Sequence, residues 1–143
     1  KCMKKYQNTL SDYKHAIELD PEYLLAYNNL GILYFDNLND YDKSLEYFQM
    51  CIKISRDYHE AYNNIGLLYN KLKEYDKGIS YITKALEIDP DNELYNLNIA
   101  ILYQNNHDYL KAIEHYEKVM EISPDNQTVE RALKKLKKKS GKK

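Results

Sequence analysis

The sequence AYNNLGILY occupies residues 26–34, and it decides the fold because the chain repeats it. The same pattern returns as AYNNIGLLY at residues 61–69 and, in weaker form, as YNLNIAILY at residues 95–103. The closing residues of the three copies, Tyr34, Tyr69 and Tyr103, lie 35 and 34 residues apart. A constant period of this length is typical of stacked repeats rather than of one irregular globule.

A second motif keeps the same period as the first. It reads DYDKSL at residues 40–45, EYDKGI at residues 74–79 and DYLKAI at residues 108–113. Two different motifs that recur in phase make chance an inadequate explanation, so we interpret the chain as an array of equivalent two-part units.

Both parts of the unit have the periodicity of an amphipathic helix. Large apolar residues recur at spacings of three and four, as in Tyr41, Leu45, Phe48 and Ile52. Polar turns separate the halves, and Asp40 can cap the helix that follows it. Proline ends several second helices, because it lacks an amide hydrogen. The pattern predicts about eight helices, at residues 5–19, 23–36, 40–54, 58–71, 75–88, 92–105, 109–122 and 126–138.

Small residues recur in phase with the large ones. Gly31 and Gly66 occupy the same position on successive first helices, and Ser44 and Gly78 do so on second helices. Glycine inside a helix costs about 1 kcal/mol relative to alanine. Its recurrence therefore predicts close helix packing, in which a small residue leaves room for a large neighbour.

Composition limits the function classes. Hydrophobic residues make up 43% of the 143 residues and charged residues 30%, which is typical of a globular protein. No apolar stretch approaches the roughly 20 residues that span a bilayer. With two cysteines and no leader-like segment, we expect a cytoplasmic location, with the nucleus as an alternative.

The net charge of −1 hides a strong asymmetry. Residues 131–143 carry Arg131 and seven lysines without any acid, whereas all 22 acidic residues lie in residues 1–130. The basic end can solubilise the last helix, and its alternatives are a nuclear-import signal or a contact for nucleic acid or an anionic membrane.

The 34-residue period, the glycine and tyrosine of the first helix and the closing proline resemble the tetratricopeptide repeat family. The resemblance implies an all-α, right-handed α-solenoid of stacked helix-turn-helix repeats. It divides the chain into the second helix of a truncated repeat (1–23), three repeats (24–58, 59–92 and 93–126), and a capping helix with a basic tail (127–143). Three departures are Arg56, which replaces the closing proline of its repeat, one extra residue near Leu38, and Asn96, which replaces the first aromatic residue of its repeat.

In that family the first helices line a concave face where peptides bind, so the resemblance also implies a binding site. The face is expected to carry Asn28, Asn29, Ile32, Phe35, Asn63, Asn64, Leu67, Lys71, Asn98, Ile101 and Asn105, together with Leu25, Glu60, Leu94 and Leu97. Asn29, Asn64 and Asn98 occupy one position in successive repeats, and the amides of such a ladder can pair with a peptide backbone. The ladder is similar to the asparagine-lined repeats of the O-linked N-acetylglucosamine transferases, although asparagine can also simply solvate an open groove. The basic residues of the chaperone-binding subset, which grips a terminal carboxylate, are absent.

Little in the sequence favours catalysis. His15, His59, His107 and His115 share no spacing typical of metal ligands, and His115 is expected on an outward helix face. Cys51 falls at a small-residue packing position, where a buried structural thiol is expected. We therefore expect no catalytic residue, no metal, no cofactor and no small-molecule substrate.

The leading interpretation is a scaffold that binds a protein or peptide on its concave face. One alternative is a non-catalytic targeting arm of a larger enzyme, such as a glycosyltransferase. Another is a structural subunit of an assembly, which self-associates through the half-repeat.

Overall fold

The computed structural model describes residues 2–141, which form eight α-helices and no strand. In chain order these are α1 (Cys2–Leu19), α2 (Leu24–Asp36), α3 (Tyr41–Ile54), α4 (His59–Lys71), α5 (Tyr75–Ile88), α6 (Glu93–Asn105), α7 (Tyr109–Ile122) and α8 (Gln127–Ser140). The expected fold class is confirmed as all-α. Lys1 of the first predicted segment and Lys142 and Lys143 of the predicted tail lie outside the described residues.

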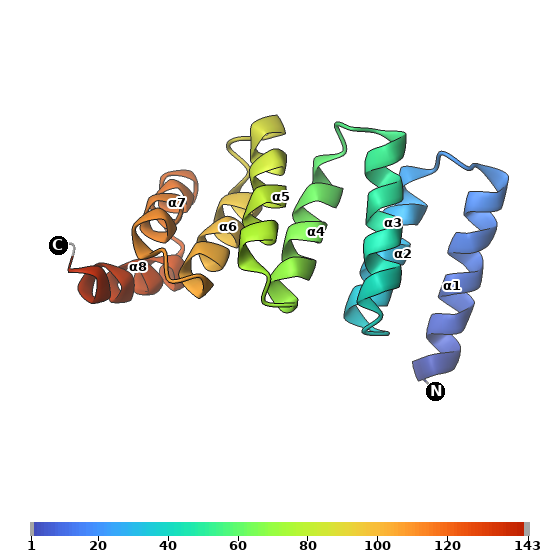
Figure 1. The fold of residues 1–143 in the computed structure, drawn as a ribbon, viewed down its shortest axis with the longest axis horizontal. Coiled ribbons are helices and arrows are strands. Elements are labelled where there is room, and N and C mark those ends of the chain that lie inside the picture. The colour runs from blue at the N-terminus through green and yellow to red at the C-terminus, as the bar shows by residue number, and fades with distance from the viewer. Residues whose placement is uncertain (1, 142–143) are drawn as a thin grey trace.

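The helices form a row that runs from α1 to α8, each packed on the next (Figure 1). Helices α2, α4 and α6 are the first helices of the repeats, and α3, α5 and α7 are the second helices. The first helices also contact one another, α2 with α4 and α4 with α6, whereas no two second helices are in contact in the described part of the chain. The first helices therefore lie on the inner side of the curve, which we call the inner face.

Most helix ends fall at the predicted residues, and the differences have local causes. Five helices begin one residue later than predicted, because the residue taken as the first helical one is the N-cap. Among these, the side chains of Asp40, Asn92 and Asn126 accept a hydrogen bond from a backbone amide of the first turn. Helix α1 begins at Cys2 instead of residue 5, and α8 ends at Ser140 instead of residue 138.

The turn with the extra residue closes in the same way as its shorter equivalents. The residue before each N-cap is left-handed in all three turns, with φ of 53° at Asn39, 62° at Lys73 and 63° at His107. The backbone amide of Asp40 bonds to the carbonyl of Tyr34, as that of Glu74 bonds to Tyr69. The extra residue is therefore absorbed within the turn.

The small residues bring helices together as predicted. A Cβ atom on Gly31 would lie 2.4 Å from the ring of Phe48, a buried residue of α3. The hydroxyl of Ser44 donates to the carbonyl oxygen of Gly31 at 2.7 Å. In the next repeat two glycines meet, and a Cβ on Gly78 would lie 2.8 Å from the carbonyl oxygen of Gly66. Each repeat is thus a tightly joined helix pair.

The last helix covers the open end of the third repeat. Val129, Leu133 and Leu136 of α8 are buried in a cluster with Ile113 and Val119 of α7. The opposite side of α8 is polar and exposed, as expected for a capping helix. Gly141 ends the helix with φ of +76°, which glycine adopts without strain.

Candidate functional site

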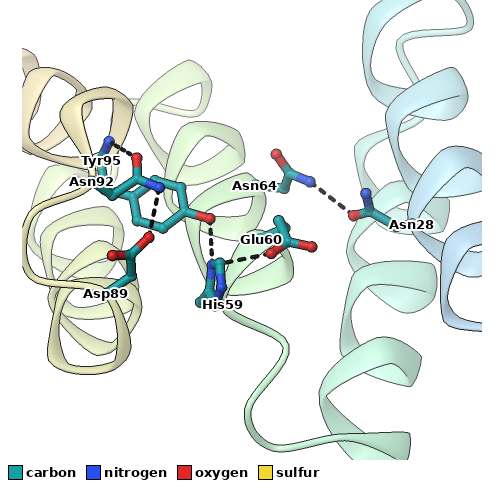
Figure 2. A network of polar contacts seen from close by, with 7 residues as sticks. All are labelled: Asn28, His59, Glu60, Asn64, Asp89, Asn92 and Tyr95. Atoms are coloured by element: carbon teal, nitrogen blue, oxygen red, sulfur yellow. Dashed lines mark hydrogen bonds and ion pairs between the residues drawn. The ribbon is translucent and has the colours of Figure 1, made fainter.

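The inner face is crossed by hydrogen bonds between asparagines of neighbouring first helices. Asn64 of α4 donates from Nδ2 to Oδ1 of Asn28 on α2 at 2.9 Å (Figure 2). Asn98 of α6 donates in the same way to Asn63 of α4 at 3.0 Å. A third pair joins the helix ends, where Asn105 donates to Asn70 at 2.9 Å. We call these three contacts the asparagine pairs.

The asparagine pairs change the predicted roles of the ladder residues. Asn28, Asn63 and Asn98 are only 8%, 3% and 7% exposed, so their side chains serve mainly the contact between repeats. Asn64 is half-buried and retains its carbonyl oxygen as a free acceptor, whereas Asn29 is half-buried without a side-chain hydrogen bond among the described residues. The three ladder residues are therefore not equivalent, because the amides of Asn64 and Asn98 donate to asparagines of the neighbouring repeat, and peptide binding by the ladder stays a prediction.

Other predicted residues come together around a hollow between α2 and α4. It has a volume of about 180 Å³ and is lined by Ile32, Phe35, Asp36, Phe48, Asn64 and Leu67. Four of these were predicted from the repeat. Asp36 and Phe48 were not, because one ends the helix and the other was assigned to the core. We call this the apolar hollow.

The remaining predicted residues line the same face without forming one cavity. Leu25 and Leu94, at equivalent positions of α2 and α6, are 51% and 54% exposed. Lys71 is exposed at the end of α4, and Ile101 is partly buried against the core that includes α8. Apolar side chains are thus available to a partner at both ends of the face.

A polar network fixes the beginnings of α4 and α6 beside this face (Figure 2). Nδ1 of His59 lies 2.7 Å from Oη of Tyr95 and 3.1 Å from Oε1 of Glu60. Burial, together with the charges of Glu60 and Asp89, raises the pKa of Tyr95 to about 12. Tyr95 therefore remains a neutral phenol, and the network positions the acidic side chain of Glu60.

His115 is not the outward residue that the sequence suggested. Its ring is half-buried, stacks on Tyr103 with 5.7 Å between centroids, and places Nδ1 3.1 Å from Oδ1 of Asn96. Because a carbonyl oxygen only accepts hydrogen bonds, Nδ1 carries the proton. The two equivalent sites in the other repeats hold tyrosine pairs, such as Tyr27 with Tyr47. Asn96 and His115 thus replace an aromatic pair together.

We expect His115 to make stability depend on pH. Burial lowers its pKa below the ordinary value of 6.5, against an opposing effect of Glu114. The unfolded chain then binds a proton at higher pH than the folded one, so stability is full above pH 6.5 and falls as the pH drops towards the folded pKa. Urea unfolding at about pH 7.5 and about pH 5 should show a smaller loss in His115→Tyr than in the wild type. Equal losses in the two proteins would contradict this role.

The described residues offer little for chemistry or membrane insertion. They contain no group of three histidine, cysteine or acidic residues placed to hold a metal. Cys51 is fully buried, as predicted, and burial raises the pKa of its thiol to about 12. None of the helices in residues 2–141 has the length and apolarity needed to cross a bilayer.

Solved structures with the same arrangement of helices are known. The crystal structure of MamA is 19% identical and superposes with a TM-score of 0.85, covering 97% of this chain and 81% of the other. A second MamA structure gives 0.84 at 19% identity, over 97% and 75% of the two chains. The Arabidopsis OM64 TPR domain gives 0.75 at 20% identity, over 82% and 96%. These likenesses confirm the right-handed solenoid. No curated protein sequence matches this one.

Family models for the tetratricopeptide repeat match the sequence at residues 12–46, 59–92 and 94–126. Together these segments cover most of the chain, including parts of every helix except α8. Repeats of this kind serve as scaffolds for protein interaction, and a fold made only of them is typically non-catalytic. With its helix pairs, its glycine contacts and three matches in succession, the chain belongs to the tetratricopeptide repeat family.

Proposed function

We propose that the inner face binds a peptide segment of a partner protein and that the apolar hollow receives one of its apolar side chains. The observation that carries this proposal is the hollow itself, in which Ile32, Phe35 and Leu67 form an apolar lining open to a ligand. Asn64 lies in the same lining and offers its unused carbonyl oxygen to a peptide amide.

The expected gain from the hollow is large enough to measure. Burying one leucine-sized or phenylalanine-sized side chain contributes about 1.5–3 kcal/mol. Since 1.4 kcal/mol corresponds to about a tenfold change in Kd, one occupied hollow alters affinity at least about tenfold. Leu25 and Leu94 are further exposed apolar residues of α2 and α6 outside the hollow.

Leu67→Arg tests the proposal, because it places a long charged side chain in the lining of the hollow. Peptides are first selected from a displayed random library on the wild-type protein, and the Kd of the best binders is then measured by fluorescence anisotropy. We expect Leu67→Arg to weaken them about tenfold or more.

Leu110→Arg is the matched control, since Leu110 is an exposed leucine of α7 outside the hollow. It should leave the Kd unchanged, and circular dichroism should show that both variants keep their helices. Selected peptides that bind Leu67→Arg as well as the wild type would refute the site. Replacing the ladder asparagines is a weaker test, because Asn64 and Asn98 also join the repeats.

The partner's identity and the compartment stay predictions, as do the alternatives of a targeting arm and a self-associating subunit.

A further inference from the structure

The last space between neighbouring repeats has the opposite character to the apolar hollow. It has a volume of about 340 Å³ and is lined by Gln104, Asn105, His107, Tyr109, Lys135, Leu136 and Lys139. By repeat position, Gln104 and Asn105 correspond to Phe35 and Asp36, and Lys135 corresponds to Leu67. The two cavities are thus equivalent places in the array, and we call this one the cationic hollow.

The charged residues that line the cationic hollow are lysines. Its lining contains two lysines and no acidic residue. Nζ of Lys139 lies 4.9 Å from the ring centroid of Tyr109, and Lys135 has no ion pair with any described residue. By contrast, Lys137 of the same helix is bound to Glu117 at 3.0 Å. Lys135 and Lys139 therefore both remain available to an anion in the hollow.

The neutral groups of the lining add further donors. Oε1 of Gln104 already accepts from the hydroxyl of Tyr116 at 2.7 Å, which leaves the N–H groups of that amide. Nδ1 of His107 lies 2.9 Å from Oη of Tyr109, so the pair shares one proton and has another to donate. Ammonium and amide donors of this kind match the oxygens of a carboxylate.

We propose that the cationic hollow binds a side-chain carboxylate of the same peptide that places an apolar side chain in the apolar hollow. This inference rests on the proposed function and adds a partner chemistry, namely a segment with an apolar residue at one end and acidic residues at the other. A nucleic acid fits less well, because residues 1–130 carry 22 acidic against 13 basic residues and repel a long polyanion.

The array sets the spacing between the two side chains. The hollows are two first-helix steps apart, and packed helices lie about 8–10 Å from axis to axis. An extended peptide advances about 3.3 Å per residue, so about five or six residues separate the two contacts.

The probes are fluorescein-labelled, C-terminally amidated peptides LLGSGSEE and its reverse EESGSGLL, with LLGSGSQQ and QQSGSGLL as neutral versions. We expect one of the two Glu peptides, LLGSGSEE or EESGSGLL, to bind the wild type about tenfold tighter than its Gln version. About 0.5 M salt should remove most of this difference in Kd, because the Debye length then falls to a few ångströms. A Gln version of the tighter-binding peptide with a free C-terminus carries a terminal carboxylate but no side-chain carboxylate. Its Kd therefore shows which kind of carboxylate the hollow binds. Tight binding of that peptide alone would overturn the assignment to a side chain.

The decisive variant is the double substitution Lys135→Gln/Lys139→Gln, and its matched control is Lys134→Gln/Lys138→Gln on the exposed side of the same helix. Both remove two charges from α8. The first should lose the preference for Glu over Gln, and the control should keep it within about twofold. If both variants lose the preference for Glu equally, a diffuse basic surface binds the peptide and the assignment to the hollow is wrong. The assignment is also wrong if an oligo-dT or phosphatidylserine vesicles bind more tightly than the peptides and this binding depends equally on all four lysines.

The two proposals fail in different ways. If Leu67→Arg leaves both Glu and Gln peptides unaffected, the apolar site is wrong. If it weakens both while the Glu and Gln peptides bind equally, only the cationic hollow is wrong. Titration with hexaglutamate, monitored by the NMR resonances of His107, tests the cationic hollow without the apolar hollow. If millimolar hexaglutamate does not shift these resonances, the cationic hollow is wrong.

Discussion

Truncating Phe48 to alanine is expected to lower the free energy of unfolding by about 3–5 kcal/mol, the cost of emptying a core site of this size. Phe48 is 1% exposed and packs in one cluster with Ile65 and Leu68 of the next repeat. Its ring also fills the space over Gly31, where no side chain can replace it. The loss therefore affects the contact within one repeat and the contact with the next.

Phe35→Ala is the matched control, because Phe35 is the other phenylalanine of the chain and is only half-buried. Denaturant unfolding monitored by circular dichroism should give a clearly smaller loss for Phe35→Ala. Similar losses for the two variants would mean that the Phe48 site collapses on truncation and that the packing over Gly31 is not rigid.

Adding one methyl group at Gly78 is expected to destabilise the protein by about 1–3 kcal/mol through overpacking. The new Cβ would lie 2.4 Å from Cδ2 of Leu102 and 2.8 Å from the carbonyl oxygen of Gly66. Leu102 is fully buried, and the Gly66 oxygen belongs to a helix backbone that cannot rotate away. This cost exceeds the gain of about 1 kcal/mol that alanine normally brings to a helix interior.

Ser80→Ala provides the comparison for Gly78→Ala, since Ser80 is an exposed residue of the same helix. It removes a hydroxyl without adding contacts and should change the stability by no more than about 0.5 kcal/mol. If Gly78→Ala raises the midpoint of urea unfolding, helix propensity dominates and the close approach of α4 and α5 does not constrain the fold.

The fold followed from the sequence because its cause is local and repeated. The spacing of Tyr41, Leu45 and Phe48 predicted a helix and its buried side, and Gly31 predicted the close contact that the ring of Phe48 makes. Five of the predicted helix starts were one residue early for a simple reason. A capping residue such as Asp40 is polar and precedes the apolar stripe, but its own backbone is not helical.

The candidate site was only partly predictable, because it depends on how neighbouring helices are rotated. Repeat position placed Ile32 and Leu67 on one face, yet it could not show that Asn64 would turn towards Asn28. The side chains of Asn96 on α6 and His115 on α7 meet although the two residues are 19 positions apart in sequence. A signal for that contact was present, since both residues depart from the tyrosines of the other repeats at the same two positions.

The asparagine pairs have a mechanical consequence. They connect consecutive repeats along the inside of the curve, whereas the helices of one repeat are locked by contacts such as that between Gly66 and Gly78. Any motion that straightens the superhelix must stretch these short amide bridges before it disturbs a helix pair. The array should therefore resist straightening through these polar contacts on the inner face, in addition to the apolar clusters that join neighbouring repeats, such as that of Phe48, Ile65 and Leu68.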